Sequence, residues 1–371
     1  MKRITLAATA IFGTALLACI ALAQAPATGP NTVVKTSRTG GDGGFDYIYA
    51  DVDARKLYIP RSGQGARVQV FDLDSLARVG EVPGFNAHGV ATDKKSGHGF
   101  ASSKPVLMFD TKTLAVIKSI EVQGNPDGIL GDPFNQRIYI FSHSAPNATV
   151  INAADGSIAG TIDLGGAPEQ AVSDGKGHIY VDIEDKDNIA VVDAKTMTVT
   201  GHYDIAGKGG GPGGLAIDAK NGILFASCHE PATMVILSAK DGKILATLPI
   251  EAGTDGAGFN PNTMEAFSSA GNGTISIIKE NSPTSFVNEQ VVKTMNGART
   301  MTVDTKNNWA LTMAIEYGPA PAPAAAPATP PVPAPGAGAP GGSGRGGGRG
   351  RGPARGPMVP DSFTIIAVGT K

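Results

Sequence analysis

Short runs of alternating apolar and polar residues recur along the whole chain, as in residues 68–72 (VQVFD) and 189–193 (IAVVD). Each run is about five residues long and is bounded by Gly, Asp, Asn or Pro. Alternation with a period of two predicts β-strands, whereas an amphipathic helix would repeat every 3.6 residues. The pattern therefore predicts an all-β protein built from many short strands.

The strands fall into seven repeats. In each repeat an anchor residue ends one apolar run, at Asp51, Asp93, Asp132, Asp174, Asp218, Asn260 and Asp304. Six or seven positions later stands a large apolar residue, at Tyr58, Phe100, Tyr139, Tyr180, Phe225, Phe267 and Leu311. The anchors are spaced by 42, 39, 42, 44, 42 and 44 residues. Four short strands in such a unit are typical of one blade of a β-propeller.

The two ends of the chain complete one another. In the last repeat the second strand is expected at 309–314 and the third at 362–368, after which the chain stops. Residues 31–40 have the pattern of a fourth strand, with no three strands before it. Pairing the two ends would remove two exposed sheet edges. We therefore predict a seven-bladed β-propeller of four-stranded blades, closed by the N-terminal strand in the last blade.

The repeats resemble a known family. Residues 179–197 read IYVDIEDKDNIAVVDAKTM, which is similar to a blade of the YVTN-repeat β-propellers. The second half of that pattern returns at 71–75 (FDLDS) and 109–113 (FDTKT), and the resemblance covers about 31–317 and 361–371. It implies an exported propeller that acts as a binding protein, and it implies no particular reaction.

The N-terminus reads as an export signal. Lys2 and Arg3 precede an apolar stretch, and residues 21–23 (ALA) offer a cleavage site, so residues 1–23 are predicted to be a signal peptide. The alternative is a lipoprotein anchored at Cys19. Cleavage after Ala23 is favoured and predicts a periplasmic or secreted protein, and the mature chain is expected to contain no transmembrane segment.

One segment interrupts the propeller. Residues 318–357 contain 12 Gly, 11 Pro, 10 Ala and 4 Arg. This composition predicts a disordered insertion, Ala/Pro-rich and then Gly/Arg-rich, between the propeller residues 24–317 and the last strand within 358–371. We expect its arginines either to bind an anionic envelope polymer or to cover the acidic mouth of the channel. The alternative is a tolerated insertion without a function.

Charge narrows the choice of partner. The chain carries 31 basic and 33 acidic residues, and four of the basic ones lie in the insertion. The propeller itself is thus acidic, which argues against nucleic acid as a partner because nucleic acids require a basic surface. We expect a monomer that binds a small ligand or an envelope protein.

Polar residues at two repeat-equivalent positions are expected to meet at one mouth of the propeller channel. The first position lies five residues before each anchor, at Asp46, His88, Asp127, Glu169, Gly213, Asp255 and Arg299. The second follows the large apolar residue, at Ser62, Lys104, His143, Glu184, His229, Gly271 and Ile315. The predicted ligand-binding residues are Asp46, His88, Asp127, Glu169, Asp255, Arg299, His143, Glu184 and His229.

Two interpretations of this mouth stay open. Asp46, His88, Asp127, Glu169 and Asp255 could hold a divalent cation, zinc through histidine or calcium through oxygen alone. Alternatively, polar side chains simply line a channel filled with water. The corresponding functions are non-catalytic binding through the top face, or hydrolysis by a metal at the mouth, as in the lactonase-type propellers.

Overall fold

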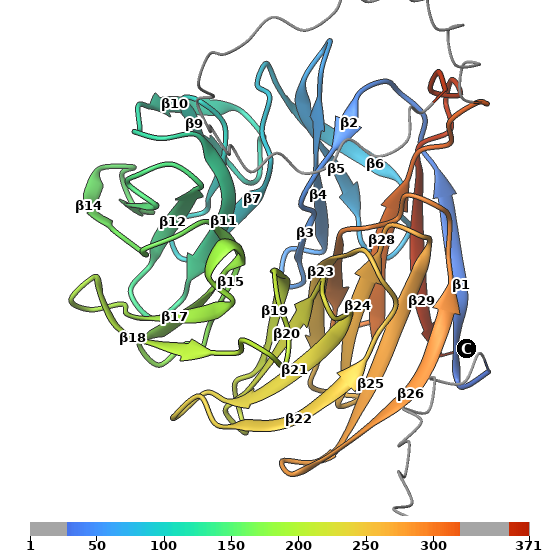
Figure 1. Cartoon of the computed structure of the whole chain (residues 1–371). Coiled ribbons are helices and arrows are strands. Elements are labelled where there is room, and N and C mark those ends of the chain that lie inside the picture. Colours follow the sequence, from blue (N-terminus) through green and yellow to red (C-terminus); the bar gives the residue numbers. More distant parts are fainter. Residues whose placement is uncertain (1–27, 320–355, 371) are drawn as a thin grey trace, which may run out of the picture.

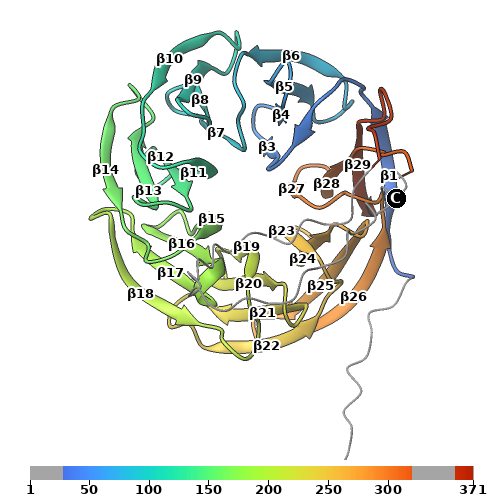
Figure 2. The same ribbon diagram turned by 45° about the horizontal axis from the view of Figure 1, so that its top comes forward.

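The computed structural model is a ring of seven β-sheets, and it describes residues 28–319 and 356–370 (Figures 1 and 2). The predicted signal peptide, Cys19 and most of the insertion lie outside the described residues. Antiparallel strands build every sheet, and the single helix described is one turn of 3₁₀-helix, Glu184–Lys186. No helix among these residues has the length and hydropathy needed to cross a bilayer. The predicted seven-bladed architecture is confirmed.

Blades one to three follow one another along the chain from the inner to the outer strand. Their strands are β2 (Gly44–Phe45), β3 (Tyr49–Asp51), β4 (Lys56–Ser62), β5 (Arg67–Asp72), β6 (Arg78–Pro83), β7 (Val90–Asp93), β8 (His98–Ala101), β9 (Val106–Asp110), β10 (Val116–Ile120), β11 (Pro126–Asp132), β12 (Arg137–Ser142), β13 (Ala148–Asn152) and β14 (Ile158–Ile162). In the first blade the inner strand is divided into β2 and β3, and both pair with β4.

The remaining four blades repeat this order. Their strands are β15 (Pro168–Ser173), β16 (His178–Ile183), β17 (Asn188–Asp193), β18 (Thr198–Asp204), β19 (Pro212–Asp218), β20 (Ile223–Cys228), β21 (Thr233–Ser238), β22 (Ile244–Pro249), β23 (Thr254–Asn260), β24 (Glu265–Ala270), β25 (Thr274–Ser282), β26 (Ser285–Lys293), β27 (Met301–Asp304), β28 (Trp309–Ala314), β29 (Thr364–Thr370) and β1 (Asn31–Arg38). Figure 2 shows the innermost strands around the axis and the fourth strands on the rim.

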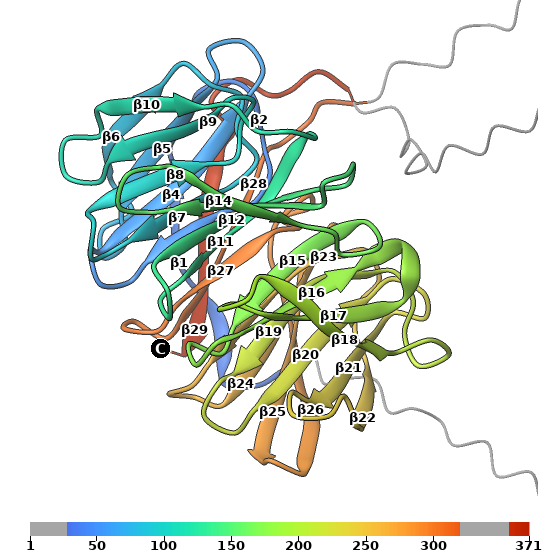
Figure 3. The ribbon, with the colours of Figure 1, turned by 90° about the vertical axis from the view of Figure 1, so that its left-hand side faces the viewer.

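The seventh blade contains both ends of the propeller. Its strand order is β1-β29-β28-β27, and β1 pairs antiparallel with β29 from Asn31 opposite Thr370 to Arg38 opposite Thr364. Figures 1 and 3 show β1 lying along β29. The N-terminal strand therefore closes the ring, as the sequence predicts. The third strand begins at Thr364, two residues later than the alternation indicates, because Ser362 turns its hydroxyl to the Glu316 amide.

The start of β1 is also fixed to the sixth blade. The Asn31 amide donates to Oε1 of Gln290 at 3.0 Å, and Gln290 Nε2 donates back to the Asn31 carbonyl at 2.8 Å. The Asn31 side chain donates to the buried carboxylate of Glu265. Burial and a hydrogen bond to Glu265 raise the pKa of the neighbouring Glu289 to about 7. These two carboxyl groups therefore share a proton below neutral pH.

The anchor residues have a local structural role. Each one accepts a backbone amide two or three residues further along the chain, at 2.7–3.2 Å, and thereby fixes the turn between the first two strands of its blade. Some anchors also join neighbouring blades. The buried Asp304 accepts two hydrogen bonds of 2.7 Å from Arg55, and Asp51 accepts one from Thr92. The repeat thus encodes both the hairpins and the contacts between blades.

The large apolar residues six or seven positions after the anchors fill the space between blades. Tyr58, Phe100, Tyr139, Tyr180, Phe225, Phe267 and Leu311 are all 4% exposed or less. Each interface has its own apolar cluster, for example Tyr58, Val70 and Phe109 between blades one and two. Buried apolar area is the main stabilising contribution in such a fold.

Close to the axis there is no room for side chains between neighbouring inner strands. A Cβ atom on Gly128 would lie 2.6 Å from the Glu169 carbonyl oxygen, and one on Gly214 would lie 2.7 Å from the Ala257 nitrogen. Both contacts are with backbone, which cannot move aside as a flexible side chain can. At the first of these positions the preceding residue, Asp127, belongs to the mouth, while the glycine allows the blades to approach.

The insertion leaves and returns at one point. Tyr317 and Met358 form an antiparallel bridge, and the Gly318 amide donates to the Pro357 carbonyl at 2.8 Å. The Val359 amide donates to the Glu316 carbonyl on the other side. The flanks of the insertion are thus joined to each other, between the second and third strands of the seventh blade.

We expect a chain that begins at Thr39, and so lacks β1, to unfold without the cooperativity of the full ring and to aggregate. Its β29 would expose a strand edge, and Glu265 and Gln290 would lose their partner Asn31. The control is a chain that begins at Thr28 and keeps β1. Thermal unfolding followed by circular dichroism, with light scattering, compares the two. Equal melting curves would show that β1 is not needed for closure.

Glu289 gives the closure a pH dependence. Because its pKa is raised in the folded protein, the unfolded chain loses this proton first, and the free energy of unfolding falls as pH rises from about 4.5 to about 7. The Glu289→Gln variant keeps a donor for Glu265 and should be more stable than the parent above pH 7, by about 1 kcal/mol at most because solvent screens the pair. At pH 4 the two should melt alike.

Chemical denaturation at pH 4, 6 and 8 measures this difference. Glu121, an exposed glutamate, provides the matched control as Glu121→Gln. If Glu289→Gln raised the free energy of unfolding equally at every pH, the inference that Glu265 and Glu289 share a proton would be wrong.

Candidate functional site

Five of the predicted site residues form one group at the channel mouth, which we call the acid–histidine cluster: Asp46, His88, Asp127, His143 and Glu169. Asp46 lies in the break between β2 and β3, and His88 precedes β7 by two residues. Asp127 and Glu169 are the second residues of β11 and β15, and His143 follows β12. Adjacent blades one to four thus supply neighbouring members of the cluster.

The side chains of the cluster are within contact distance of one another. His88 Nδ1 lies 2.8 Å from Asp46 Oδ2 and 3.3 Å from Asp127 Oδ1. His143 Nε2 lies 3.5 Å from the other oxygen of Asp127, Oδ2, and 3.3 Å from Glu169 Oε1. Asp127 therefore stands between two histidines and offers one oxygen to each.

Proximity of unlike charges changes the titration of the cluster. The hydrogen bond to Asp46 raises the pKa of His88, and the one to Glu169 raises the pKa of His143. Burial, followed by the charge of Asp46, raises the pKa of Asp127 as well. The carboxylate charge at the mouth is thus held in a partly desolvated place, where a positive charge stabilises it.

Asp255 and Arg299 form a second group beside the cluster. Arg299 Nη1 lies 2.9 Å from Asp255 Oδ2, and its Nη2 lies 3.5 Å from Asp46 Oδ1. The predicted cation ligands therefore do not all meet. Asp255 is paired with an arginine, whereas His143, expected only to line the ligand site, joins the candidate metal ligands.

The other two predicted residues, Glu184 and His229, face a cavity. Their nearest charged atoms are 3.9 Å apart. The cavity has a volume of about 740 Å³, and Glu184, Asp187, His229, Glu230, Asp255 and Arg299 line it together with several glycines. We call it the mouth chamber. Because Arg299 contacts both the chamber wall and Asp46, the chamber adjoins the acid–histidine cluster.

Tyr47 lines the channel and contacts the acid–histidine cluster. Its hydroxyl donates to Glu169 Oε2 at 2.8 Å, so a side chain from the first blade reaches the fourth. Burial and the nearby carboxylates raise the pKa of the Tyr47 phenol well above its usual value, so this proton stays in place as a donor. The acid–histidine cluster is therefore oriented from its channel side by a fixed hydrogen bond.

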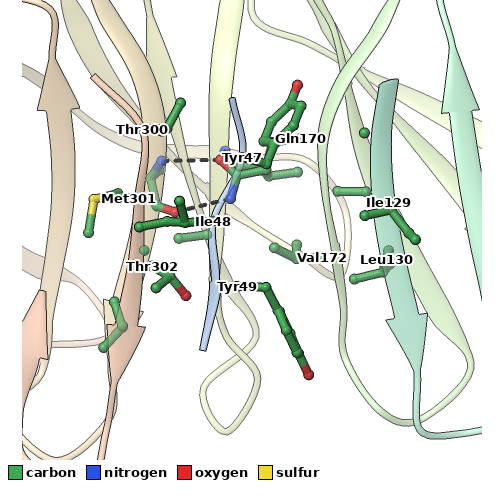
Figure 4. Close-up of a pocket in the computed structure, with 18 of the residues that line it drawn as sticks. Tyr47, Ile48, Tyr49, Ile129, Leu130, Gln170, Val172, Thr300, Met301 and Thr302 are labelled. Atoms are coloured by element: carbon green, nitrogen blue, oxygen red, sulfur yellow. Dashed lines mark hydrogen bonds between the residues drawn. The ribbon is translucent and has the colours of Figure 1, made fainter. Parts of the chain in front are cut away.

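The channel itself is narrow and mostly apolar. Its volume is 330 Å³, and inner strands from all seven blades line it. Figure 4 shows Ile48, Ile129, Leu130, Val172 and other small side chains around it. The amide of Gln170 reaches from the fourth blade to the sixth, where Oε1 accepts from the Ala257 amide and Nε2 donates to the Ala257 carbonyl, both at 3.1 Å. Polar chemistry is thus concentrated at the mouth.

A buried arginine holds the loop that carries Asp46. Arg61 is completely buried in β4, and its guanidinium donates to the carbonyls of Gly41, Asp42 and Gly43 at 2.9–3.2 Å. It also lies 3.7 Å over the ring of Phe363. Burial lowers the pKa of Arg61 to about 10, so it stays charged at neutral pH. Since Asp46 follows this loop closely, Arg61 fixes the loop from which Asp46 enters the mouth.

The carboxylates of residues 182–187, around the loop between the second and third strands of the fourth blade, hold the backbone in place. Asp182 is completely buried and accepts the Gln170 amide, while burial raises its pKa well above the usual value. Asp185 accepts the Ala167 amide, and Asp187 accepts the Gly211 amide. These carboxylates point to different backbone groups.

The buried Cys228 is not a ready nucleophile, because burial raises the pKa of its thiol to about 12.

Sequence reasoning missed three residues that support the site. Tyr47 directly follows the ring position Asp46, at a place where four other blades carry glycine, and this departure from the repeat is visible in the sequence. Gln170 follows Glu169 in the same way. Arg61 carries no comparable signal, because its role depends on a loop twenty residues away.

Comparison with known proteins identifies the fold and no family. No family model matches the chain, and no curated protein matches it. Among solved structures, a chain of hydrazine synthase from Kuenenia stuttgartiensis superposes with a TM-score of 0.63 at 14% identity, covering 74% of this chain and 94% of that one. A chain of the mitotic checkpoint complex gives a TM-score of 0.65 at 9% identity, covering 82% and 95%. At these identities the likeness extends to the propeller fold alone.

The cluster predicts an observable titration. In the metal-free protein, His88 and His143 should titrate above pH 6.5, and their stabilising contribution should be full below that pH and lost as pH rises through the folded-state pKa. Asp127→Asn should lower both pKa values, because this carboxylate faces both rings. Histidine NMR signals followed from pH 5 to 9 measure this. Asp53→Asn, on the opposite face, is the control. If the pKa values of His88 and His143 were unchanged in Asp127→Asn, the observed contacts of Asp127 with both rings would be contradicted.

Proposed function

We propose that this protein is an exported YVTN-type propeller that acts as a binding protein, and that its mouth takes up a small positively charged ligand, most simply a divalent cation. The observation that carries the proposal is the concentration of carboxylates at one mouth. Asp46, Asp127, Glu169, Glu184 and Asp255 lie there, and Arg299 is the arginine that contacts them among the described residues. Carboxylates with low-dielectric walls focus a negative potential, which attracts cations.

The arrangement of the mouth supports binding at a defined place. Tyr47 holds Glu169 from the channel side, and the mouth chamber adjoins the cluster through Arg299. A ligand that enters the chamber is therefore close to the cluster. The buried Arg61 holds the loop that precedes Asp46, and Asp185 and Asp187 accept backbone amides from neighbouring loops, so little ordering is needed when a ligand binds.

A second candidate function is hydrolysis that depends on the bound cation. It is favoured by the size of the mouth chamber, because 740 Å³ is more than a bare ion requires and falls within the range of small-molecule sites. A cation in the cluster would polarise a carbonyl group placed in the chamber. Lactones and simple esters are the substrates to try.

Ligand binding can be measured by thermal unfolding and calorimetry. We expect Zn²⁺ or Ca²⁺ at ~100 times its dissociation constant to raise the free energy of unfolding by roughly 2.7 kcal/mol. The double variant Asp127→Asn, Glu169→Gln should lose this gain, while Asp53→Asn on the opposite face should keep it. Spermidine serves as an organic cation in the same assay.

The outcomes separate the functions. Stabilisation by a cation without turnover of lactones or esters supports the binding function, and turnover lost in the double variant supports the hydrolase. If neither divalent ions nor spermidine change the melting temperature, the proposed function is wrong and the mouth is lined with polar groups for solvation alone.

A further inference from the structure

The acid–histidine cluster contains two sets of three potential metal ligands that share one residue. Asp46, His88 and Asp127 form the first set, and Asp127, His143 and Glu169 form the second. In each set the donor atoms lie within 4.8 Å of one another. Three side chains of this kind are the number that open zinc sites in enzymes use.

The distances between donors suit a cation at the centre of each set. Ligand atoms at about 2.0–2.1 Å from a tetrahedral zinc ion lie roughly 3.3–3.4 Å from each other. The observed contacts range from 2.8 Å, between His88 Nδ1 and Asp46 Oδ2, to 3.5 Å, between His143 Nε2 and Asp127 Oδ2. Small side-chain movements would therefore be enough to admit an ion.

Asp127 is placed as a bridge. Its Oδ1 faces His88 and its Oδ2 faces His143, so the two oxygens serve different sets. A carboxylate that binds one ion with each oxygen holds two cations a few ångströms apart, as in two-metal sites at about 3.5–4 Å.

The two outer carboxylates are held by groups that are not ligands. Glu169 turns Oε1 to His143, while its Oε2 accepts the Tyr47 hydroxyl. Asp46 turns Oδ2 to His88, while its Oδ1 lies near Arg299. In each case a donor from outside the cluster fixes one oxygen and leaves the other facing the histidine. Such outer contacts orient metal ligands and raise metal affinity.

The chemical types of the ligand atoms indicate which class of cation fits each set. Each set contains one imidazole nitrogen and two carboxylates, which suits zinc and similar transition metals. Calcium prefers six to eight oxygen ligands and would leave the imidazoles unused. Three protein ligands would leave a four-coordinate ion one further position, for water or for an oxygen of a ligand.

We propose that the mouth holds two divalent cations of the zinc class, bridged by Asp127, with Asp46 and His88 on the first and His143 and Glu169 on the second. This inference rests on the proposed function, because it names the ligand and the number of ions at the same mouth. Asp255 takes no part, since Arg299 holds it.

Titration of the chelator-treated full chain with Zn²⁺ tests the stoichiometry. We expect two equivalents per chain by calorimetry and by elemental analysis after dialysis. His88→Ala and His143→Ala should each retain one equivalent, and Asp127→Asn should weaken both sites by about 100-fold or more. Asp53→Asn, on the opposite face, is the matched control and should bind two. Circular dichroism checks that each variant is folded.

A spectroscopic measurement on the unmodified chain keeps the test independent of the variants. Loading with Co²⁺ should give two bound ions whose electron paramagnetic resonance signal is weakened by coupling through the bridge. One equivalent, or two that are magnetically isolated, would overturn the bridged pair and leave the binding function intact. Stabilisation by spermidine with no Zn²⁺ bound would also overturn it, and no binding of any cation would refute the proposed function as well.

Discussion

The structure depends on the close approach of seven inner strands around one axis. The backbones come so near that Gly128 and Gly214 leave no room for a Cβ atom. Gly128 directly follows Asp127, so a close approach of two backbones lies beside a charged residue of the mouth. Apolar side chains make up most of the channel lining, and charged residues gather where the inner strands begin. The mouth is thus a consequence of the packing that forms the ring.

Most of the fold could be predicted from the sequence because the repeat is expressed in local chemistry. An anchor carboxylate that fixes a turn and a large apolar residue six or seven positions later act within one blade, so their spacing survives in the linear pattern. Closure could be predicted because the last blade lacks one strand and the N-terminus supplies one. The division of the first inner strand into β2 and β3 could not, since it depends on the loop that Arg61 holds.

The site could be predicted in part. Repeat positions indicate which side chains reach the mouth, and Asp46, His88, Asp127 and Glu169 lie together there. They do not indicate which pairs form, because that depends on side-chain directions across several blades. Asp255 therefore turned out to pair with Arg299, and His143 to complete the cluster. Tyr47 escaped notice because a tyrosine next to a ring position reads as an ordinary channel-lining residue until its hydroxyl is seen on Glu169.

Closure by the two ends of the chain sets the order of folding. Asn31 pairs with Thr370, so the contact with the greatest sequence separation in the structure is the one that completes the ring. The other six blades are each built from strands that are neighbours in the sequence, whereas β1 pairs with a strand from the far end of the chain. Contacts between residues so far apart in the sequence form slowly. The residues synthesised last therefore decide when the first strand finds its place, and until then the chain remains an open arc.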